Sequence, residues 1–283
     1  MANATSSRRE ALRAQQLAAQ RAARTRRMIG IGAAIVAVVL VAVFGVILVN
    51  QLGKGGGSVV PPNAVVNQCG VQAGTNPNSL KDGIGIAQDK AKADAPTVQL
   101  FADYHSPGCK AFDAAFGEKL NELAQSGDIK YSVQIETFLD RLGTNKSTDP
   151  AIAASCADVV GVFPQFHLEI FKNQPDTEGA GYTKDQLRNT IPAAVGLSGD
   201  KLTQFQQCFD DRATASFVEQ QNKFNGAFTS AQYTKLGGNN SAEGKAWGST
   251  PLLTVNNKRL DTSTLTTSDA NSIADAIKKL AAS

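Results

Sequence analysis

The stretch TVQLFADYHSPGCKAFDAAFGEKLNELAQSGDIKYSVQIETF (Thr97–Phe138) decides the fold. Apolar residues alternate in Thr97–Tyr104 and again in Lys130–Phe138, which predicts two strands because successive strand side chains point to opposite faces. Between these strands, Cys109–Ser126 has helical spacing in its apolar residues Phe112, Phe116, Leu120 and Leu123. A strand, a helix and a strand in this order predict a parallel pair joined by a right-handed crossover.

The rest of the chain extends this core. After residue 138 the pattern is helical for about a hundred residues, and strand character returns at Leu252–Asn256 and Lys258–Leu260. The chain closes with a helix whose apolar face is Ile273, Ile277, Leu280 and Ala281. This order predicts an α/β protein, a thioredoxin fold over 95–283 with a helical insertion at about 146–240.

Three pieces of the chain resemble one family. FADYHSPGCKAF (Phe101–Phe112) resembles the active-site turn of DsbA-like thiol-disulfide oxidoreductases, in which a strand leads into C-P-x-C-K. Trp247–Pro251, followed by LLTVNN, resembles the cis-proline loop of these proteins and its following strand. Ala154–Ala157 and Phe166–Leu168 are similar to the insertion helices of membrane-anchored actinobacterial members. The resemblance covers about 90–283 and implies a cis peptide at Thr250–Pro251 facing an extended peptide.

The chain departs from this family at the expected nucleophile. The candidate site is Ser106, Pro107, Gly108 and Cys109, with serine where the family has its first cysteine. Thiol exchange needs a thiolate, and a serine hydroxyl cannot form a disulfide. Cys109 stands in the place of the resolving cysteine. The resemblance therefore implies a redox-degenerate site, in which no residue is assigned a catalytic role. We expect His105 to be a polar turn residue and His167 to pack in the core.

Four cysteines are present, and they allow three pairings: Cys69, Cys109, Cys156 and Cys208. The resemblance implies a structural disulfide between Cys156 and Cys208, with two buried free thiols as the alternative. Cys69 and Cys109 form a possible second pair, with free or intermolecular thiols as the alternative. With two histidines and scattered cysteines we expect neither a metal site nor a cofactor.

The N-terminal part predicts a membrane anchor. Residues 28–50 contain no charged residue, and 23 residues span a bilayer core of roughly 30 Å. Residues 1–27 carry seven arginines and one glutamate, so this segment is expected in the cytoplasm and 51–283 outside it. We interpret 51–94 as an extracytoplasmic linker, with ordered structure beginning near Ala95.

Charge and site together narrow the function. The formal net charge is +3, of which 1–27 contribute +6, so the remaining body sums to −3 and does not favour nucleic-acid binding. The leading hypothesis is a single-pass membrane protein acting as an accessory or binding subunit of a membrane complex, or binding another extracytoplasmic protein. The resemblance to the thioredoxin-fold accessory subunit of cytochrome bcc–aa3 supercomplexes makes a respiratory supercomplex one candidate. The alternatives are a thiol-disulfide oxidoreductase or isomerase using Cys109, alone or with Cys69, and a holdase chaperone.

Overall fold

The computed structural model describes residues 59–66, 81–142, 145–176, 179–223 and 250–283 of the chain. The predicted membrane segment 28–50, Cys69 and Trp247 lie outside these ranges. Within the described ranges, none of the helices is both long and apolar enough to cross a membrane.

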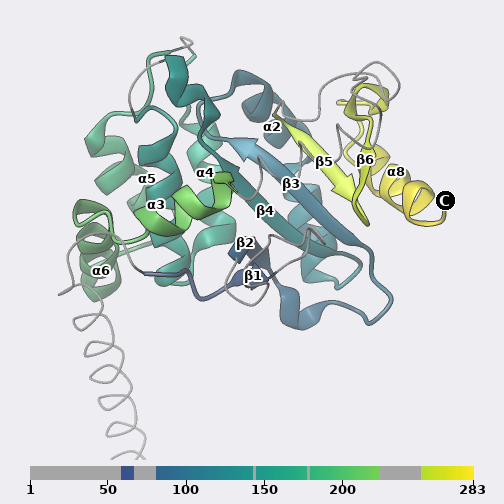
Figure 1. The fold of residues 1–283 in the computed structure, drawn as a ribbon, viewed down its shortest axis with the longest axis horizontal. Coiled ribbons are helices and arrows are strands. Elements are labelled where there is room, and N and C mark those ends of the chain that lie inside the picture. Colours follow the sequence, from purple (N-terminus) through teal and green to yellow (C-terminus); the bar gives the residue numbers. More distant parts are fainter. Residues whose placement is uncertain (1–58, 67–80, 143–144, 177–178, 224–249) are drawn as a thin grey trace, which may run out of the picture. The chain divides into compact units, whose positions relative to one another are not determined.

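A six-stranded sheet forms the centre of the described chain (Figure 1). The predicted parallel pair is confirmed: β3 (Thr97–Asp103) lies parallel to β4 (Lys130–Glu136), with Val98 opposite Tyr131. The other neighbouring strands pair antiparallel in the order β1-β2-β4-β3-β5-β6. The outer strands are β1 (Ala64–Val66), β2 (Lys81–Ile86), β5 (Leu252–Val255) and β6 (Lys258–Leu260).

Helix α2 (Pro107–Gln125) connects the parallel pair and contacts β2 and β4. Its buried side carries the predicted apolar residues Phe112, Phe116 and Leu120. Helix α8 (Asn271–Ala281) packs beside α2 and against β5 and β6, with Ile273 and Ile277 buried. Because α2 begins where β3 ends, the N-terminus of this helix lies at the carboxyl end of the sheet's parallel pair.

The helical insertion follows β4 and gathers to one side of the sheet (Figure 1). It comprises η2 (Phe138–Leu142), α3 (Thr148–Val159), α4 (Phe163–Lys172), η3 (Gln186–Thr190), α5 (Ile191–Ala194), α6 (Gly199–Asp210) and the helical residues 215–223. Two short turns, η1 (Gln88–Lys90) and η4 (Thr262–Thr264), lie elsewhere. Beyond the β2–β4 pairing, which ends at Ile84 opposite Val133, the side chains of Gln221 and Asn222 accept hydrogen bonds from the backbone N–H groups of Ile135 and Thr137. The insertion thus covers part of the β4 edge.

Ordered structure begins earlier than the sequence indicates, because β1 and β2 lie within the segment interpreted as a linker. Glycines hide the alternation of β2. A Cβ at Gly83 would lie 2.4 Å from Gln134 Nε2, and one at Gly85 would lie 2.5 Å from Gln88 Cγ. The Gln134 amide beside Gly83 is the end of a flexible side chain and can move aside, whereas the contact at Gly85 is with the middle of the Gln88 side chain. Glycine at these alternate positions removes the side chains that would have revealed the strand.

Residues 59–66 are attached to the helical insertion. The Val59 N–H donates to the Ala213 carbonyl at 2.8 Å. The buried Asp158 carboxylate of α3 accepts hydrogen bonds from the backbone N and the side-chain Nδ2 of Asn63, each at 2.8 Å. Burial raises the pKa of Asp158, whereas the hydrogen bonds from Asn63 oppose this rise.

A disulfide joins Cys156 of α3 to Cys208 of α6, the pair that the family resemblance implies. Both residues are buried. Nearby, the rings of Phe166 and Phe205 connect α4 to α6 with centroids 5.5 Å apart. The covalent bond and the aromatic contact thus hold the same group of helices together.

Replacing both bridged cysteines by serine (Cys156→Ser with Cys208→Ser) should lower the free energy of unfolding. Their sequence separation of 52 residues closes a loop whose loss costs about 4 kcal/mol in the chain-entropy model. Urea unfolding followed by circular dichroism measures the change, and the unmodified chain under reducing conditions should lose a similar amount. Unchanged unfolding of the double variant would contradict a structural role for this bond.

Candidate functional site

The candidate site is the turn between β3 and α2. Ser106 is the N-cap of α2, and its Oγ accepts a hydrogen bond from the Cys109 backbone N–H at 3.4 Å. Pro107 follows at the first helical position, where no intrahelical N–H is needed. The serine that replaces the expected nucleophile thus has a structural role, because its side chain accepts a hydrogen bond from one of the backbone N–H groups that have no partner within the helix.

The loop at Thr250–Pro251 lies against this turn, and its peptide bond is cis. A Cβ placed on Gly108 would lie 3.4 Å from Pro251 Cδ and 3.6 Å from both Ser106 Oγ and the Thr250 carbonyl oxygen. The structure therefore brings Ser106 and Gly108 together with the proline loop, which lies 142 to 145 residues later in the sequence.

Cys109 lies in the first turn of α2 with only 1% of its surface exposed. Among the described residues it forms no disulfide. Burial raises the pKa of its thiol to about 11, although the hydroxyls of Thr250 and Ser106 act in the opposite direction. At neutral pH the sulfur is therefore a protonated and enclosed thiol, which is a poor nucleophile.

Asp103 stabilises the turn through hydrogen bonds between its carboxylate and the backbone. Its buried carboxylate accepts hydrogen bonds from the His105 N–H at 2.9 Å and from the Leu139 N–H at 3.1 Å, and burial raises its pKa. The His105 side chain is 5% exposed, and neither ring nitrogen has a hydrogen-bond partner among the described residues. His105 does lie in the turn, as expected, but its side chain is buried.

A row of buried polar side chains, Tyr104, His167 and Asp113, runs behind the turn. Tyr104 Oη lies 2.9 Å from His167 Nδ1, and His167 Nε2 lies 3.5 Å from Asp113 Oδ1. Burial lowers the pKa of His167 to about 3 and raises that of Asp113 to about 8. His167 does pack among aromatic rings as expected, but sequence reasoning missed its contacts with Tyr104 and Asp113.

This row predicts a pH dependence of stability with two opposing parts. Between about pH 4 and 8 the folded chain keeps a proton on Asp113 that the unfolded chain loses, so stability falls as pH rises. Between about pH 3 and 6.5 only the unfolded chain protonates His167, so this residue makes stability rise with pH. Above pH 6.5, Asp113 is the one of these two residues that still changes the stability with pH.

Between pH 6.5 and 8, Asp113 should lower the free energy of unfolding of the unmodified chain by at most about 1.4 kcal/mol per pH unit. The Asp113→Asn variant should lack this decrease. Urea unfolding of both proteins across this range measures the difference between them. A constant difference across these pH values would mean that Asp113 ionises similarly in the folded and unfolded chains.

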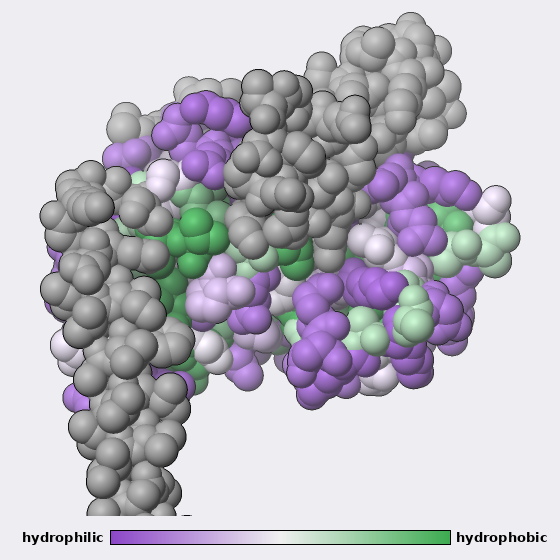
Figure 2. Space-filling view, turned by 60° about the horizontal axis from the view of Figure 1, so that its bottom comes forward, coloured by the Kyte–Doolittle hydropathy of each residue, from purple (hydrophilic) through white to green (hydrophobic). Residues whose placement is uncertain are grey.

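One face of the described surface is drawn in Figure 2. Figure 2 shows extensive hydrophilic areas with smaller hydrophobic areas between them. Of the large hydrophobic side chains in the described ranges, Val60 is the one that is exposed. These residues therefore give the holdase hypothesis no support. In the same ranges, no three His, Cys, Asp or Glu side chains gather closely enough to hold a metal ion.

Comparison with known proteins identifies relatives of this fold. The chain is 30% identical over 139 residues to Disulfide bond formation protein D of Bacillus subtilis, covering 47% of this chain and 59% of that relative. The chain thus spans about three fifths of the curated relative that it matches. The solved MdbA protein, a thiol-disulfide oxidoreductase from Actinomyces oris, superposes with a TM-score of 0.51 at 15% identity, covering 75% of this chain and 98% of MdbA.

A further solved structure, oxidised BdbD from Bacillus subtilis, has 24% identity and a TM-score of 0.47, with coverage of 71% of this chain and all of BdbD. At these identities the likeness to MdbA shows a shared fold. The family model described as thioredoxin matches residues 90–276, which is more than half of the chain and includes the turn, the helical insertion and the proline loop. On this match, together with its βαβ–insertion–ββα order, the chain belongs to the thioredoxin family.

Proposed function

We propose that this protein is anchored in the membrane by residues 28–50 and uses its extracytoplasmic thioredoxin-fold domain to bind a partner protein without thiol exchange. The partner would be a subunit of a membrane complex, with a respiratory supercomplex as one candidate. The observation that carries the proposal is the altered turn. Ser106 supplies a helix cap in place of a nucleophile, and Cys109 is enclosed with a raised pKa.

The same turn keeps features suited to binding. Thr250–Pro251 is cis and lies against Gly108. In a cis-proline loop the backbone is available to pair with an extended peptide. Loss of thiol chemistry and retention of a peptide-facing loop together favour a binding module.

The relatives favour a second candidate, a thiol-disulfide oxidoreductase or isomerase using Cys109. Disulfide bond formation protein D and the MdbA oxidoreductase carry names that describe thiol chemistry. In this chain such chemistry would require Cys109 to become exposed and ionised. Cys69 would be the candidate for a second thiol. The reactivity of Cys109 therefore separates the two candidates.

Alkylation of Cys109 should be slow at neutral pH. A thiol with a pKa of about 11 is ionised about 100-fold less at pH 8 than one with its usual pKa near 9. Timed labelling of the folded, full-length chain with iodoacetamide, followed by mass spectrometry of the Cys109 peptide, measures this rate against an unfolded sample. Fast labelling of the folded chain, or mixed disulfides with client proteins, would favour the oxidoreductase.

Ser106→Cys provides the matched gain-of-function control, and Ser106→Ala provides the corresponding loss of the cap. The first variant places a thiol at the N-terminus of α2, where the helix dipole favours a thiolate. It should form a disulfide with Cys109 and acquire thiol-exchange activity towards a reduced peptide, whereas Ser106→Ala should not. Activity of the unmodified chain equal to that of Ser106→Cys would contradict a redox-inactive site.

Affinity purification from membranes should test the partner. The unmodified chain and Ser106→Ala should recover the same membrane complex, because neither binding nor anchoring requires a nucleophile at the turn. Quantitative mass spectrometry of the purified material, before and after thiol reduction, provides the measurement. Loss of the partner on reduction, or the absence of membrane-complex subunits from the purified material, would contradict the proposal.

A further inference from the structure

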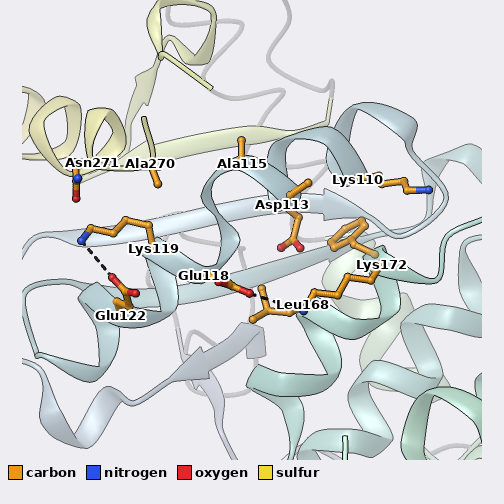
Figure 3. Close-up of a pocket in the computed structure, with 12 residues that line it drawn as sticks. Lys110, Asp113, Ala115, Glu118, Lys119, Glu122, Leu168, Lys172, Ala270 and Asn271 are labelled. Atoms are coloured by element: carbon orange, nitrogen blue, oxygen red, sulfur yellow. Dashed lines mark hydrogen bonds and ion pairs between the residues drawn. The ribbon is translucent and has the colours of Figure 1, made fainter. Parts of the chain in front are cut away.

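A cavity of about 510 Å³ lies on the outer side of α2, between α4 and the start of α8 (Figure 3). This volume is within the range of small-molecule sites. Ala114, Ala115, Leu168 and Phe171 supply its apolar lining. The cavity is separate from the Pro251 loop, because neither Thr250 nor Pro251 lines it.

Asp113 is the buried polar group of this cavity. Its side chain is 4% exposed, and Figure 3 shows the carboxyl group directed into the space between α2 and α4. His167 Nε2 lies 3.5 Å from Asp113 Oδ1, and neither atom makes a hydrogen bond with a described residue. A buried carboxyl group in this position is costly unless something pairs with it.

Gly117 makes room for this carboxyl group. A Cβ at that position would lie 2.3 Å from Asp113 Oδ1 and 2.8 Å from Leu168 Cδ2. Any larger residue would therefore push the acid out of its place. The local sequence admits a buried carboxyl group at the cavity wall and at the same time leaves part of its hydrogen-bonding capacity unused.

The charges at the cavity rim are mutually neutralised. Lys110 pairs with Asp176 at 2.7 Å, Lys119 with Glu122 at 3.2 Å, and Lys172 with Glu118 at 3.8 Å. Figure 3 shows the last two pairs on either side of the opening. Each rim lysine thus has an acidic partner, whereas the buried Asp113 has no lysine or arginine within ion-pair distance among the described residues. An incoming cation would supply the partner that Asp113 lacks.

From this geometry we propose that the cavity binds a small organic cation, with a primary ammonium group on the Asp113 carboxylate and its alkyl chain along Leu168 and Phe171. Asp113 Oδ1 is enclosed beside His167, so the ammonium group would donate to the other carboxylate oxygen and leave two protons for neighbouring oxygens. The apolar wall suits an alkyl body. This site is independent of the proposed function at the Pro251 loop.

Binding of such a cation is coupled to ionisation of Asp113. Burial holds the pKa of Asp113 at about 8, so near pH 7 the free protein carries a proton there. An ammonium ligand binds the ionised form of Asp113, so its binding releases this proton. The titratable and charged groups that face Asp113 from the surrounding elements are Lys110 and Glu118 of α2, His167 and Lys172 of α4, and the tyrosines Tyr104, Tyr131 and Tyr182.

The test uses the full-length chain in detergent with ¹³C-labelled aspartate carboxyl groups, titrated at pH 7 with n-butylammonium chloride. The Asp113 carboxyl signal should move to its ionised position and saturate. Uncharged n-butanol, which has the same alkyl chain, should not produce this shift. Asp113→Asn should weaken binding, followed by the ligand's own signals, about tenfold or more. Glu219→Gln removes one exposed carboxylate away from the cavity and should leave binding unchanged.

Ala114→Phe supplies a second variant if Asp113→Asn does not fold. Ala114 lines the cavity and is exposed, so the larger side chain fills the opening while Asp113 keeps its place. This variant should abolish the response to n-butylammonium. No movement of the Asp113 signal up to about 10 mM ligand, an equal response to n-butanol, or an unchanged response in Ala114→Phe would each overturn the proposal.

Discussion

The parallel pairing of β3 with β4 constrains the rest of the molecule, because two parallel neighbours need a crossover between them. In this chain the crossover is α2, so the N-terminus of the helix must lie at the carboxyl end of β3. Everything chemical near the turn follows from that position. The cap at Ser106, the enclosed sulfur of Cys109 and the proline loop packed on Gly108 all surround the start of one helix.

Polar contacts join the helical insertion to this core, in addition to the packing of α4 on α2. Tyr182 of the insertion donates from its hydroxyl to the carbonyls of Tyr104 and Ile170, at 3.1 and 2.9 Å. His167 contacts Tyr104 from α4, while Asp103 accepts a hydrogen bond from Leu139 after β4. Directional contacts of this kind fix the orientation of two packed units more strictly than apolar contacts do. The turn and the insertion are therefore positioned by the same few residues.

Sequence periodicity predicted the elements whose faces differ in polarity. The strands at Thr97 and Lys130 and the helix between them were visible because one face of each is apolar. Strand β2 was missed because Gly83 and Gly85 carry no side chains that could alternate with the apolar residues. The neighbouring side chains that lie close to these glycines are known only from the structure. Asp113 was missed for a related reason: a single acid on an amphipathic helix resembles a solvated residue until the packing of α4 against it is known. For the turn itself, the change from cysteine to serine was readable directly, whereas the enclosure of Cys109 depends on tertiary contacts.

The attachment of residues 59–66 to the insertion has a mechanical consequence. A pull applied at the N-terminal side of Val59 reaches first its hydrogen bond to Ala213, and next the two hydrogen bonds between Asn63 and Asp158. Asp158 lies on α3, which the Cys156–Cys208 bond joins covalently to α6. Load entering from that end therefore passes at Asn63 both into a cross-linked group of helices and into β2, whose Gly85 N–H donates to the Asn63 carbonyl at 2.8 Å.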